Sequence, residues 1–185
     1  MSILASFVVT SVDGFYAGPN DEFDWPVVDA EFNDFAVAQL DQAEALLFGR
    51  TTYEHMAAYW PTELATGNDP AITGRMNRMP KLVFSRTLEV ADWSNTRLAK
   101  GEASEHIPAL KGEPGKDLLV LGSPHLTANL VDAGWLDELR LMIWPIALGR
   151  GRTLFDNSHD RVPLQLNDVR EFNSGNVLLT YRPGA

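Results

Sequence analysis

Short, continuous apolar runs recur along the first two thirds of the chain. Residues 45–48 and 118–121 are continuous apolar runs, and residues 81–85 have the apolar centre Leu82-Val83-Phe84; such runs are typical of strands buried on both faces of a sheet. Residues 3–11 are rich in β-branched and aromatic side chains and also predict a strand. Strands of this kind belong to parallel sheets that helices cover on both sides.

Between these runs, apolar positions return at helical spacing. The spacing predicts helices over residues 29–43, 102–111 and 124–133. Thr51 and Glu54 stand three residues apart, as in a capping box, and predict a helix that runs to about residue 60. Strands and helices therefore alternate along most of the chain.

The last part of the chain has a different pattern. Residues 139–143 alternate as a strand, and residues 162–172 and 176–182 flank the turn sequence Asn173-Ser174-Gly175, which predicts a β-hairpin. The expected fold class is α/β, with a mainly parallel central sheet, helices on both faces and a C-terminal antiparallel hairpin. Such sheets bind ligands beyond the carboxyl ends of their parallel strands.

A single domain over residues 1–185 fits this pattern, because the Gly- and Pro-containing breaks at 66–70 and 111–115 are too short to be interdomain linkers. The formal net charge is −10, which disfavours a nucleic-acid partner. There is no cysteine, which excludes a disulfide framework, a thiolate nucleophile and Cys-ligated zinc, and fits a cytoplasmic protein.

The apolar N-terminal run lacks a basic flank, and no run reaches membrane-spanning length, so we expect neither a signal peptide nor a membrane partner. Asp156, His159 and Asp160 do not have the spacing of a familiar metal site. We therefore expect no metal.

Three of the predicted strands end in loops that suit phosphate groups. A glycine lets an anion approach the backbone, an arginine offers a fork of donors, and a helix start presents free N–H groups. An ordinary turn or a solvated arginine is the alternative at each loop. Three such loops along one sheet edge would suit a dinucleotide, although no G-x-G-x-x-G sequence is present. The loops are Gly49-Arg50-Thr51-Thr52, Ser85-Arg86-Thr87 and Gly122-Ser123-Pro124-His125-Leu126.

Four motifs in order resemble the dihydrofolate-reductase-like superfamily, and most closely the RibD C-terminal domain of the riboflavin-pathway deaminase–reductase. The resemblance covers nearly the whole chain. A zinc deaminase signature needs cysteine, so the resemblance implies a stand-alone reductase domain. The motifs are Ser11-Val12-Asp13-Gly14-Phe15-Tyr16-Ala17-Gly18, Phe48-Gly49-Arg50-Thr51-Thr52-Tyr53-Glu54, Lys81-Leu82-Val83-Phe84-Ser85-Arg86, and the run from Leu121-Gly122-Ser123 through Gly134-Trp135-Leu136-Asp137 and Gly149-Arg150-Gly151 to Phe155.

The resemblance implies that NADPH binds along these motifs. The 49–52 loop would meet the cofactor's phosphates, and Ser85 and Arg86 would hold the adenosine end with its 2′-phosphate. The 122–126 loop would follow the pyrophosphate and the nicotinamide ribose, while the backbone near Val9 and Tyr16 would contact the nicotinamide amide. Relatives often have Gly-Gly at 122–123, so Ser123 is a mild departure.

A carboxylic acid early in the first helix would orient the substrate or relay a proton. By position the best match is Asp29, with Glu31 and Asp34 as further candidates, and its structural alternative is a helix N-cap. Asp13 is a further substrate-binding candidate. Trp25, Tyr53, Tyr59 and Trp60 would wall the pocket of a flat heterocycle or else belong to the core. The basic cluster Arg75, Arg78 and Lys81 would anchor a substrate phosphate or form a solvated face.

These inferences predict an NADPH-dependent reductase of a C=N or C=O bond in a small heterocyclic or sugar-like substrate. It would resemble 5-amino-6-(5-phosphoribosylamino)uracil reductase or dihydrofolate reductase. The alternatives are a non-catalytic nucleotide-binding regulatory module on the same fold and a flavodoxin-like FMN carrier. The family likeness also implies a homodimer, for which the apolar residues 141–144 would be an interface strand or, equally, part of the core.

Overall fold

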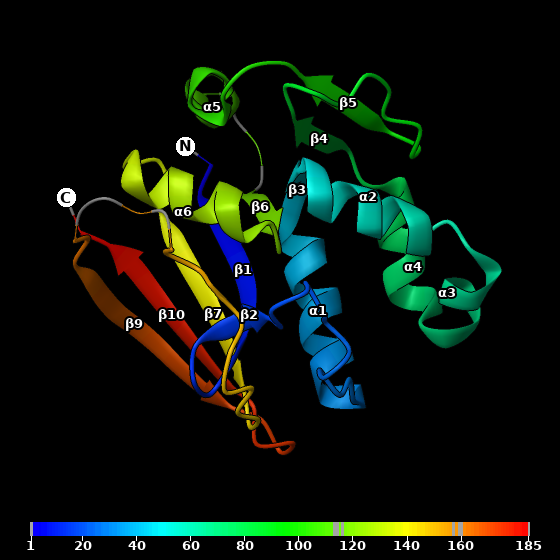
Figure 1. Cartoon of the computed structure of the whole chain (residues 1–185). Helices are drawn as coiled ribbons and strands as arrows, with labels where there is room; N and C mark the ends of the chain where they lie inside the picture. Colours follow the sequence, from blue (N-terminus) through cyan, green and yellow to red (C-terminus); the bar gives the residue numbers. More distant parts are fainter. Residues whose placement is uncertain (1, 113–114, 116, 157, 159–160, 185) are drawn as a thin grey trace.

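A twisted eight-stranded sheet runs through the molecule (Figure 1). The computed structural model describes residues 2–112, 115, 117–156, 158 and 161–184. The sheet has the order β5-β4-β3-β6-β1-β7-β10-β9, and a short pair, β2 with β8, stands beside it. The strands are β1 (Leu4–Ser11), β2 (Phe15–Ala17), β3 (Ala43–Gly49), β4 (Lys81–Phe84), β5 (Thr96–Ala99), β6 (Asp117–Leu121), β7 (Glu138–Trp144), β8 (Arg152–Thr153), β9 (Leu164–Glu171) and β10 (Val177–Pro183).

Every pairing from β5 across to β7 is parallel, and the hairpin β9–β10 joins β7 in antiparallel fashion. The predicted fold class is therefore confirmed, including the C-terminal hairpin. The helices are α1 (Ala30–Gln42), α2 (Arg50–Tyr59), α3 (Glu63–Asn68), α4 (Pro70–Arg78), α5 (Ala103–Gly112) and α6 (Pro124–Asp132).

The sheet buries apolar side chains on both of its faces. In β3, Leu46 and Phe48 point into one core cluster, while Leu47 between them points into the other; each is 0% exposed. The first cluster includes residues of α1, α2 and α4, and the second includes residues of α5 and α6. This alternation explains why the strand carries a continuous apolar run.

Local signals set the helix starts. Asp29 is the N-cap of α1, because its Oδ1 accepts the Phe32 N–H at 2.8 Å. Thr62 caps α3 in the same way through Ala65 N–H, and Pro70 stands in the first turn of α4, where its missing N–H costs nothing.

The predicted capping box in α2 is wrong. The helix begins at Arg50 with Gly49 as its N-cap, and Glu54 pairs with Arg50 one turn earlier, at 3.2 Å, instead of reaching back to cap the helix. The reason is that Arg50 and Glu54 are four residues apart, which suits a side-chain ion pair on one helix face.

Some elements were not expected from the sequence. The break expected at residues 66–70 is the junction of the short helices α3 and α4, and the four-residue strand β5 and the β2–β8 pair were also missed. Residues 141–144 lie in β7 between β1 and β10; Met142 and Trp144 are at most 3% exposed and belong to the core, whereas Leu141 and Ile143 are half-buried. A role of this strand in a dimer interface stays a prediction.

Within the described residues, no helix is both long enough and apolar enough to cross a bilayer. Of the three metal-ligand candidates, His159 and Asp160 lie outside the described residues. No group of three or more His, Cys, Asp or Glu side chains that could hold a metal ion occurs among the residues described.

Candidate functional site

Two helices begin side by side at the carboxyl edge of the sheet. Strands β3 and β6 are parallel neighbours, and α2 follows β3 while α6 follows β6. The N-cap residues Gly49 and Ser123 make no side-chain hydrogen bond to their own helices. The backbone N–H groups of both first turns therefore lack an intrahelical acceptor and are available to an anion.

The two helix starts are tied together by reciprocal hydrogen bonds. Gly49 N–H donates to Ser123 Oγ at 3.0 Å, and Ser123 N–H donates to Thr52 Oγ1 at 3.1 Å. Ser123 is 3% exposed. The relative position of the 49–52 and 122–126 loops is thus fixed by contacts within the protein.

The turn into α6 needs small residues. Gly122 has φ +63° and Ser123 has φ +50°, in the left-handed region that favours glycine. A Cβ on Gly122 would come within 3.2 Å of the Thr52 methyl carbon. Glycine would suit both conformations, but position 123 has a serine whose hydroxyl accepts the Gly49 N–H.

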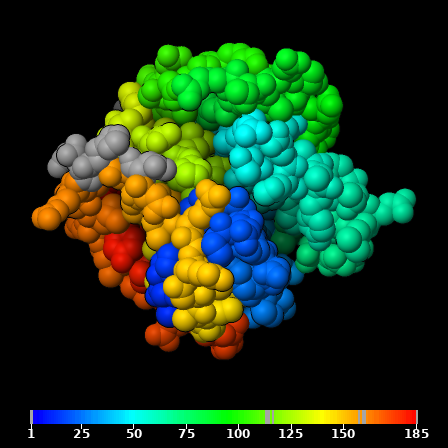
Figure 2. Space-filling model, in the orientation of Figure 1, coloured from blue at the N-terminus to red at the C-terminus, as the bar shows by residue number. Residues whose placement is uncertain are grey.

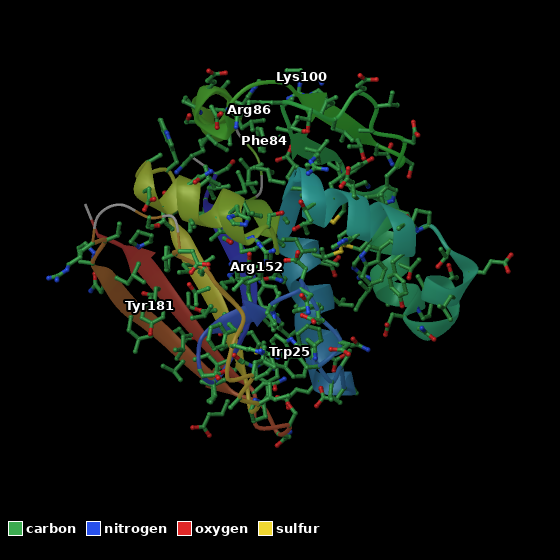
Figure 3. The ribbon with its side chains drawn as sticks, viewed as in Figure 1. Trp25, Phe84, Arg86, Lys100, Arg152 and Tyr181 are labelled. Carbon is green, nitrogen blue, oxygen red and sulfur yellow. The ribbon has the colours of Figure 1, made fainter. Side chains whose placement is uncertain are left out.

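A cavity of about 600 Å³ opens next to these helix starts, between α5 and α6. That volume lies in the usual range for a small-molecule site. Phe84, Leu126 and Leu130 give it apolar walls, while Arg86 and Glu102 bring charge to it. Figure 3 places Phe84 and Arg86 beside β4 and α5, whereas Trp25 lies at the opposite end of the view, near α1. The remaining lining residues are Gly49, Ser85, Gly101, Ala103, Ser104, His125, Asn129, Asp132 and Ala133.

Ser85 and Arg86 occupy different environments at this cavity. Ser85 is 7% exposed, and its Oγ accepts the N–H groups of Thr87 at 3.2 Å and Leu88 at 2.9 Å. The Arg86 side chain is exposed and its Nη1 lies 3.2 Å from Glu102 Oε1. Arg86 is thus the solvent-exposed donor of the pair, and Ser85 mainly shapes the loop.

Tyr16 from β2 reaches the start of α6. Its hydroxyl lies 3.4 Å from His125 Nε2, and the two rings meet edge to face at 6.3 Å between centroids. Burial raises the pKa of Tyr16, although nearby Arg152 acts in the opposite direction, so its hydroxyl keeps its proton at neutral pH. Arg152 in turn pairs with Asp21 at 2.6 Å. Tyr16 and His125, two predicted cofactor contacts, are therefore neighbours.

Asp13 joins two loops. Its carboxylate accepts the Ser11 hydroxyl at 2.6 Å and the backbone N–H groups of Leu148 at 3.0 Å and Gly149 at 2.7 Å. These bonds, the one from Ser11 foremost, lower the pKa of Asp13 to about 2. Figure 2 shows the corresponding contact of the yellow-orange segment after β7 with the blue N-terminal segment. Asp13 therefore holds the two loops together. Its contact with substrate stays a prediction.

The acidic residues at the start of α1 have distinct surroundings. Asp29 is half-buried and caps the helix through one carboxylate oxygen. Glu31 accepts the Asn173 N–H at 2.8 Å and lies 3.5 Å from Arg170, so it ties the hairpin to the helix. Asp34 is exposed. The hydrogen bond from Phe32 N–H shows that Asp29 is an N-cap. A catalytic role for Asp29 stays a prediction.

The aromatic candidates separate into core and boundary positions. Tyr53 is 3% exposed, packs on Phe48 and Trp93, and accepts the Trp93 N–H at 3.0 Å, so it fits the core alternative and not a pocket wall. Trp25 and Trp60 are half-buried against the first core cluster. The Trp60 Nε1–H points to Met56 Sδ, whereas the buried Trp25 Nε1 has no partner among the described residues.

The cluster of Arg75, Arg78 and Lys81 does not form one anion site. Arg75 makes a two-point ion pair with Asp41, at 2.7 and 2.8 Å. Lys81 is 2% exposed, and its Nζ donates to the backbone carbonyls of Met76 and Met79 at 2.7 Å each. The expectation of a solvated face is wrong for Lys81, which holds the C-terminal end of α4.

Glu102, Asn129 and Asp132 line the cavity but were not among the predicted site residues. Glu102 follows the short strand β5, whose pattern over residues 96–99 was not recognised. Val9, predicted near the nicotinamide, is half-buried on β1 against the first core cluster.

The donor set matches what a dinucleotide phosphate requires. The two helix starts without side-chain caps lie at a cavity whose lining includes Gly49, His125 and Leu126 and the Arg86 guanidinium. A Cβ on Gly49 would lie 3.8 Å from the Leu126 side chain and 3.9 Å from the Ser123 side chain, in ordinary van der Waals contact. The residues present therefore fit NADPH, the cofactor that the fold implies.

Comparison with known proteins agrees with this geometry. A family model described as the RibD C-terminal domain matches residues 3–178. The uncharacterized Bacillus subtilis protein YyaP is 32% identical over 181 residues, which cover 97% of this chain and 93% of YyaP.

Solved structures share the fold at low identity. A Shewanella sp. PV-4 protein named for riboflavin biosynthesis has a TM-score of 0.75 at 22% identity, with 99% of both chains covered. A Thermotoga maritima deaminase and 5-amino-6-(5-phosphoribosylamino)uracil reductase has a TM-score of 0.71 at 18% identity, over 99% of this chain and 57% of the Thermotoga chain.

The Enterococcus faecalis dihydrofolate reductase complexed with NADP(H) has a TM-score of 0.59 at 15% identity, over 99% of this chain and 97% of that enzyme. The fold is therefore dihydrofolate-reductase-like. Because the family model covers nearly every residue and YyaP is similar along almost its full length, this chain belongs to the RibD C-terminal domain family.

Proposed function

We propose that this protein is a reductase that uses NADPH to reduce a C=N or C=O bond in a small heterocyclic or sugar-like substrate. The observation that carries the proposal is the pair of helix starts at Gly49 and Ser123, both without side-chain caps and tied together at the carboxyl edge of the sheet. That edge is where α/β sheets bind nucleotides.

The proposed orientation follows from the position of the cavity. The adenosine end would lie between α5 and α6, against Phe84 and Leu130, with Arg86 at the 2′-phosphate. The pyrophosphate would lie on the first turns of α2 and α6, near Thr51 and Leu126. The nicotinamide end would extend toward Tyr16 and Val9, since Tyr16 stands over the start of α6.

When bound, NADPH would supply a hydride to the electrophilic carbon, and the neighbouring nitrogen or oxygen would take a proton from an acid or from water. The residues of the chain hold the reactants in place, which is a large part of catalysis in such reactions. Asp29 is the carboxyl group proposed to orient the substrate, and the buried, unpartnered indole N–H of Trp25 is a second polar group on the segment that leads into α1.

The names of the structural relatives narrow the substrate class. The Thermotoga enzyme is named for a pyrimidine that carries a phosphoribosylamino group, and the Enterococcus enzyme is named for dihydrofolate. A nitrogen heterocycle is therefore the substrate class that we propose. Riboflavin biosynthesis is the pathway that we propose for this protein.

A charge placed at the proposed phosphate site tests the function. Thr51→Asp puts a carboxylate in the exposed first turn of α2, where it should leave folding intact because acids favour helix N-termini. It should weaken NADPH binding at least about tenfold through repulsion of the phosphates. Binding is measured by titrating NADPH and following its fluorescence and the tryptophan emission.

Ala71→Asp is the matched control, since it adds the same charge to the exposed first turn of α4, away from the cavity. It should leave NADPH affinity within about twofold. If wild-type protein shows no NADPH binding at millimolar concentration, the proposed function is wrong. If Thr51→Asp and Ala71→Asp lose the same NADPH affinity, the cofactor's phosphates do not bind at the first turn of α2.

Two simple observations separate the alternatives. A regulatory module would bind NADPH but show no oxidation of it with any nitrogen heterocycle tested, including the pyrimidine substrate named for the Thermotoga enzyme. An FMN carrier would purify yellow and would not need NADPH for its colour. A colourless protein that oxidises NADPH in the presence of such a heterocycle supports the reductase.

A further inference from the structure

We propose that Glu102 opposes the 2′-phosphate of NADPH and thereby keeps the preference for NADPH over NADH small. The inference rests on the proposed function, because it assigns the cavity between α5 and α6 to the adenosine end of the cofactor. Glu102 is not among the site residues that the family resemblance implies.

The charges at the cavity do not resemble a strongly cationic phosphate site. Arg86 is the one guanidinium in the described lining, and the same lining includes two carboxylates, those of Glu102 and Asp132. A 2′-phosphate carries a charge between about −1.5 and −2 at neutral pH. It would therefore meet one attractive charge and two repulsive ones.

The contact of Glu102 with Arg86 is built into the sheet. Strands β4 and β5 pair in register with Phe84 opposite Ala99, and Ser85 N–H continues the ladder to Ala99 O at 3.2 Å. Gly101, with φ +98°, then turns the chain into α5 and brings Glu102 back to Arg86. The carboxylate and the guanidinium thus stand on two segments whose backbones are paired.

The ion pair itself is weak enough to exchange. Both side chains are more than half exposed, at 79% for Arg86 and 57% for Glu102, and solvent screens such pairs strongly. An incoming phosphate would draw Arg86 away, because a guanidinium can bind it at two points. Glu102 would remain on its backbone segment within reach of the phosphate and would oppose it.

NADH presents the opposite chemistry at the same place. Its adenosine ribose has a free 2′-hydroxyl, which can donate a hydrogen bond to a carboxylate such as Glu102. The same side chain therefore favours NADH and disfavours NADPH. Arg86 acts in the other direction, so the two residues would balance each other and both cofactors would bind.

The test compares dissociation constants of NADPH and NADH, measured by fluorescence titration at about 0.15 M ionic strength, where the Debye length is about 8 Å. In Glu102→Gln, NADPH should bind about threefold to tenfold more tightly, and NADH should bind equally or more weakly. In Arg86→Ala, NADPH should lose affinity and NADH should change little. The control is Glu105→Gln, which removes the same charge one turn along α5 from a residue outside the cavity lining.

Competition by nucleotide fragments assigns the effect to the adenosine end. Glu102→Gln should strengthen displacement by 2′,5′-ADP and leave displacement by 5′-ADP nearly unchanged, whereas Glu105→Gln should alter neither by more than about twofold. Circular dichroism and melting temperature confirm that each variant is folded.

The outcomes separate this inference from the function on which it rests. If wild-type protein binds neither NADPH nor NADH, the proposed function is wrong, and so is the role of Glu102 that rests on it. If both cofactors bind but Glu102→Gln leaves the ratio of their dissociation constants unchanged, or changes it no more than Glu105→Gln does, the role of Glu102 is wrong and the reductase proposal stands.

Discussion

Ser123 accepts the backbone N–H of Gly49 across two loops that are 74 residues apart, at 3.0 Å. Ser123 has a left-handed backbone conformation, with φ +50°, which glycine adopts without a steric penalty. The hydrogen bond thus compensates for the conformational strain. It also fixes the distance between the two helix starts that would bind the phosphates.

Replacing Ser123 separates the hydrogen bond from the strain. Ser123→Ala keeps the left-handed residue and leaves the Gly49 N–H without its acceptor, so it should cost about 1–3 kcal/mol of unfolding free energy. Ser123→Gly should cost about 1 kcal/mol less, since it relieves the strain while losing the same bond. Urea denaturation measures both, and an alanine variant as stable as the glycine variant would contradict this account.

Asp13 should make stability depend on acid pH. Its pKa in the folded protein is about 2, below the ordinary value of 3.8, so its stabilising contribution is present above about pH 4 and is lost as the pH falls toward 2. Wild type should therefore be more stable than Asp13→Asn at pH 6, and the gap should narrow between pH 4 and pH 2. Urea midpoints at several pH values measure the gap.

Ser11→Ala provides the companion variant for this prediction. It removes the hydrogen bond that contributes most to the low pKa of Asp13, so the pH dependence should become smaller. A gap between wild type and Asp13→Asn that stays constant from pH 6 to pH 2.5 would show that the carboxylate charge does not hold the 148–149 loop.

Asp29 can be tested for its two roles separately. Asparagine is a good N-cap, so Asp29→Asn should retain nearly wild-type stability, whereas Asp29→Ala should lose about 1 kcal/mol. If the carboxyl group orients substrate or relays a proton, Asp29→Asn should also lower NADPH oxidation with an accepted heterocycle at unchanged stability. A variant that oxidises NADPH at the wild-type rate would leave Asp29 with the capping role alone.

Lys81 should affect stability at alkaline pH. Burial lowers its pKa from 10.5 to about 8, so between these values the unfolded chain holds the extra proton. Raising the pH from 8 to 10.5 then favours the folded state. Lys81→Met keeps the apolar stem, lacks this titration and loses the bonds to the carbonyls of Met76 and Met79.

The measurement for Lys81 is the difference in unfolding free energy between wild type and Lys81→Met at several pH values. Wild type should gain relative to the variant as the pH rises from 8 to 10. A difference that stays the same across this range would mean that the lysine is not desolvated in the folded protein.

The sequence by itself determined the longer strands and helices and the family, but not the short elements α3, α4, β2, β5 and β8. The uninterrupted apolar run in β3 required burial on two faces, which Leu46 and Leu47 confirm by pointing into opposite core clusters. The glycine at 122 and the loops before α2 and α6 could also be recognised, because they depend on neighbours close in the chain. Periodicity, caps and turns are properties of a few consecutive residues.

Only the tertiary structure decided which distant side chains meet. Tyr16 and His125 are 109 residues apart, and Asp13 lies 136 residues from Gly149. The pairing of Arg86 with Glu102 depends on β5 lying beside β4. The physical reason is that strand order in a sheet is set by packing over the whole chain, whereas a local pattern is the same whichever strand becomes its neighbour.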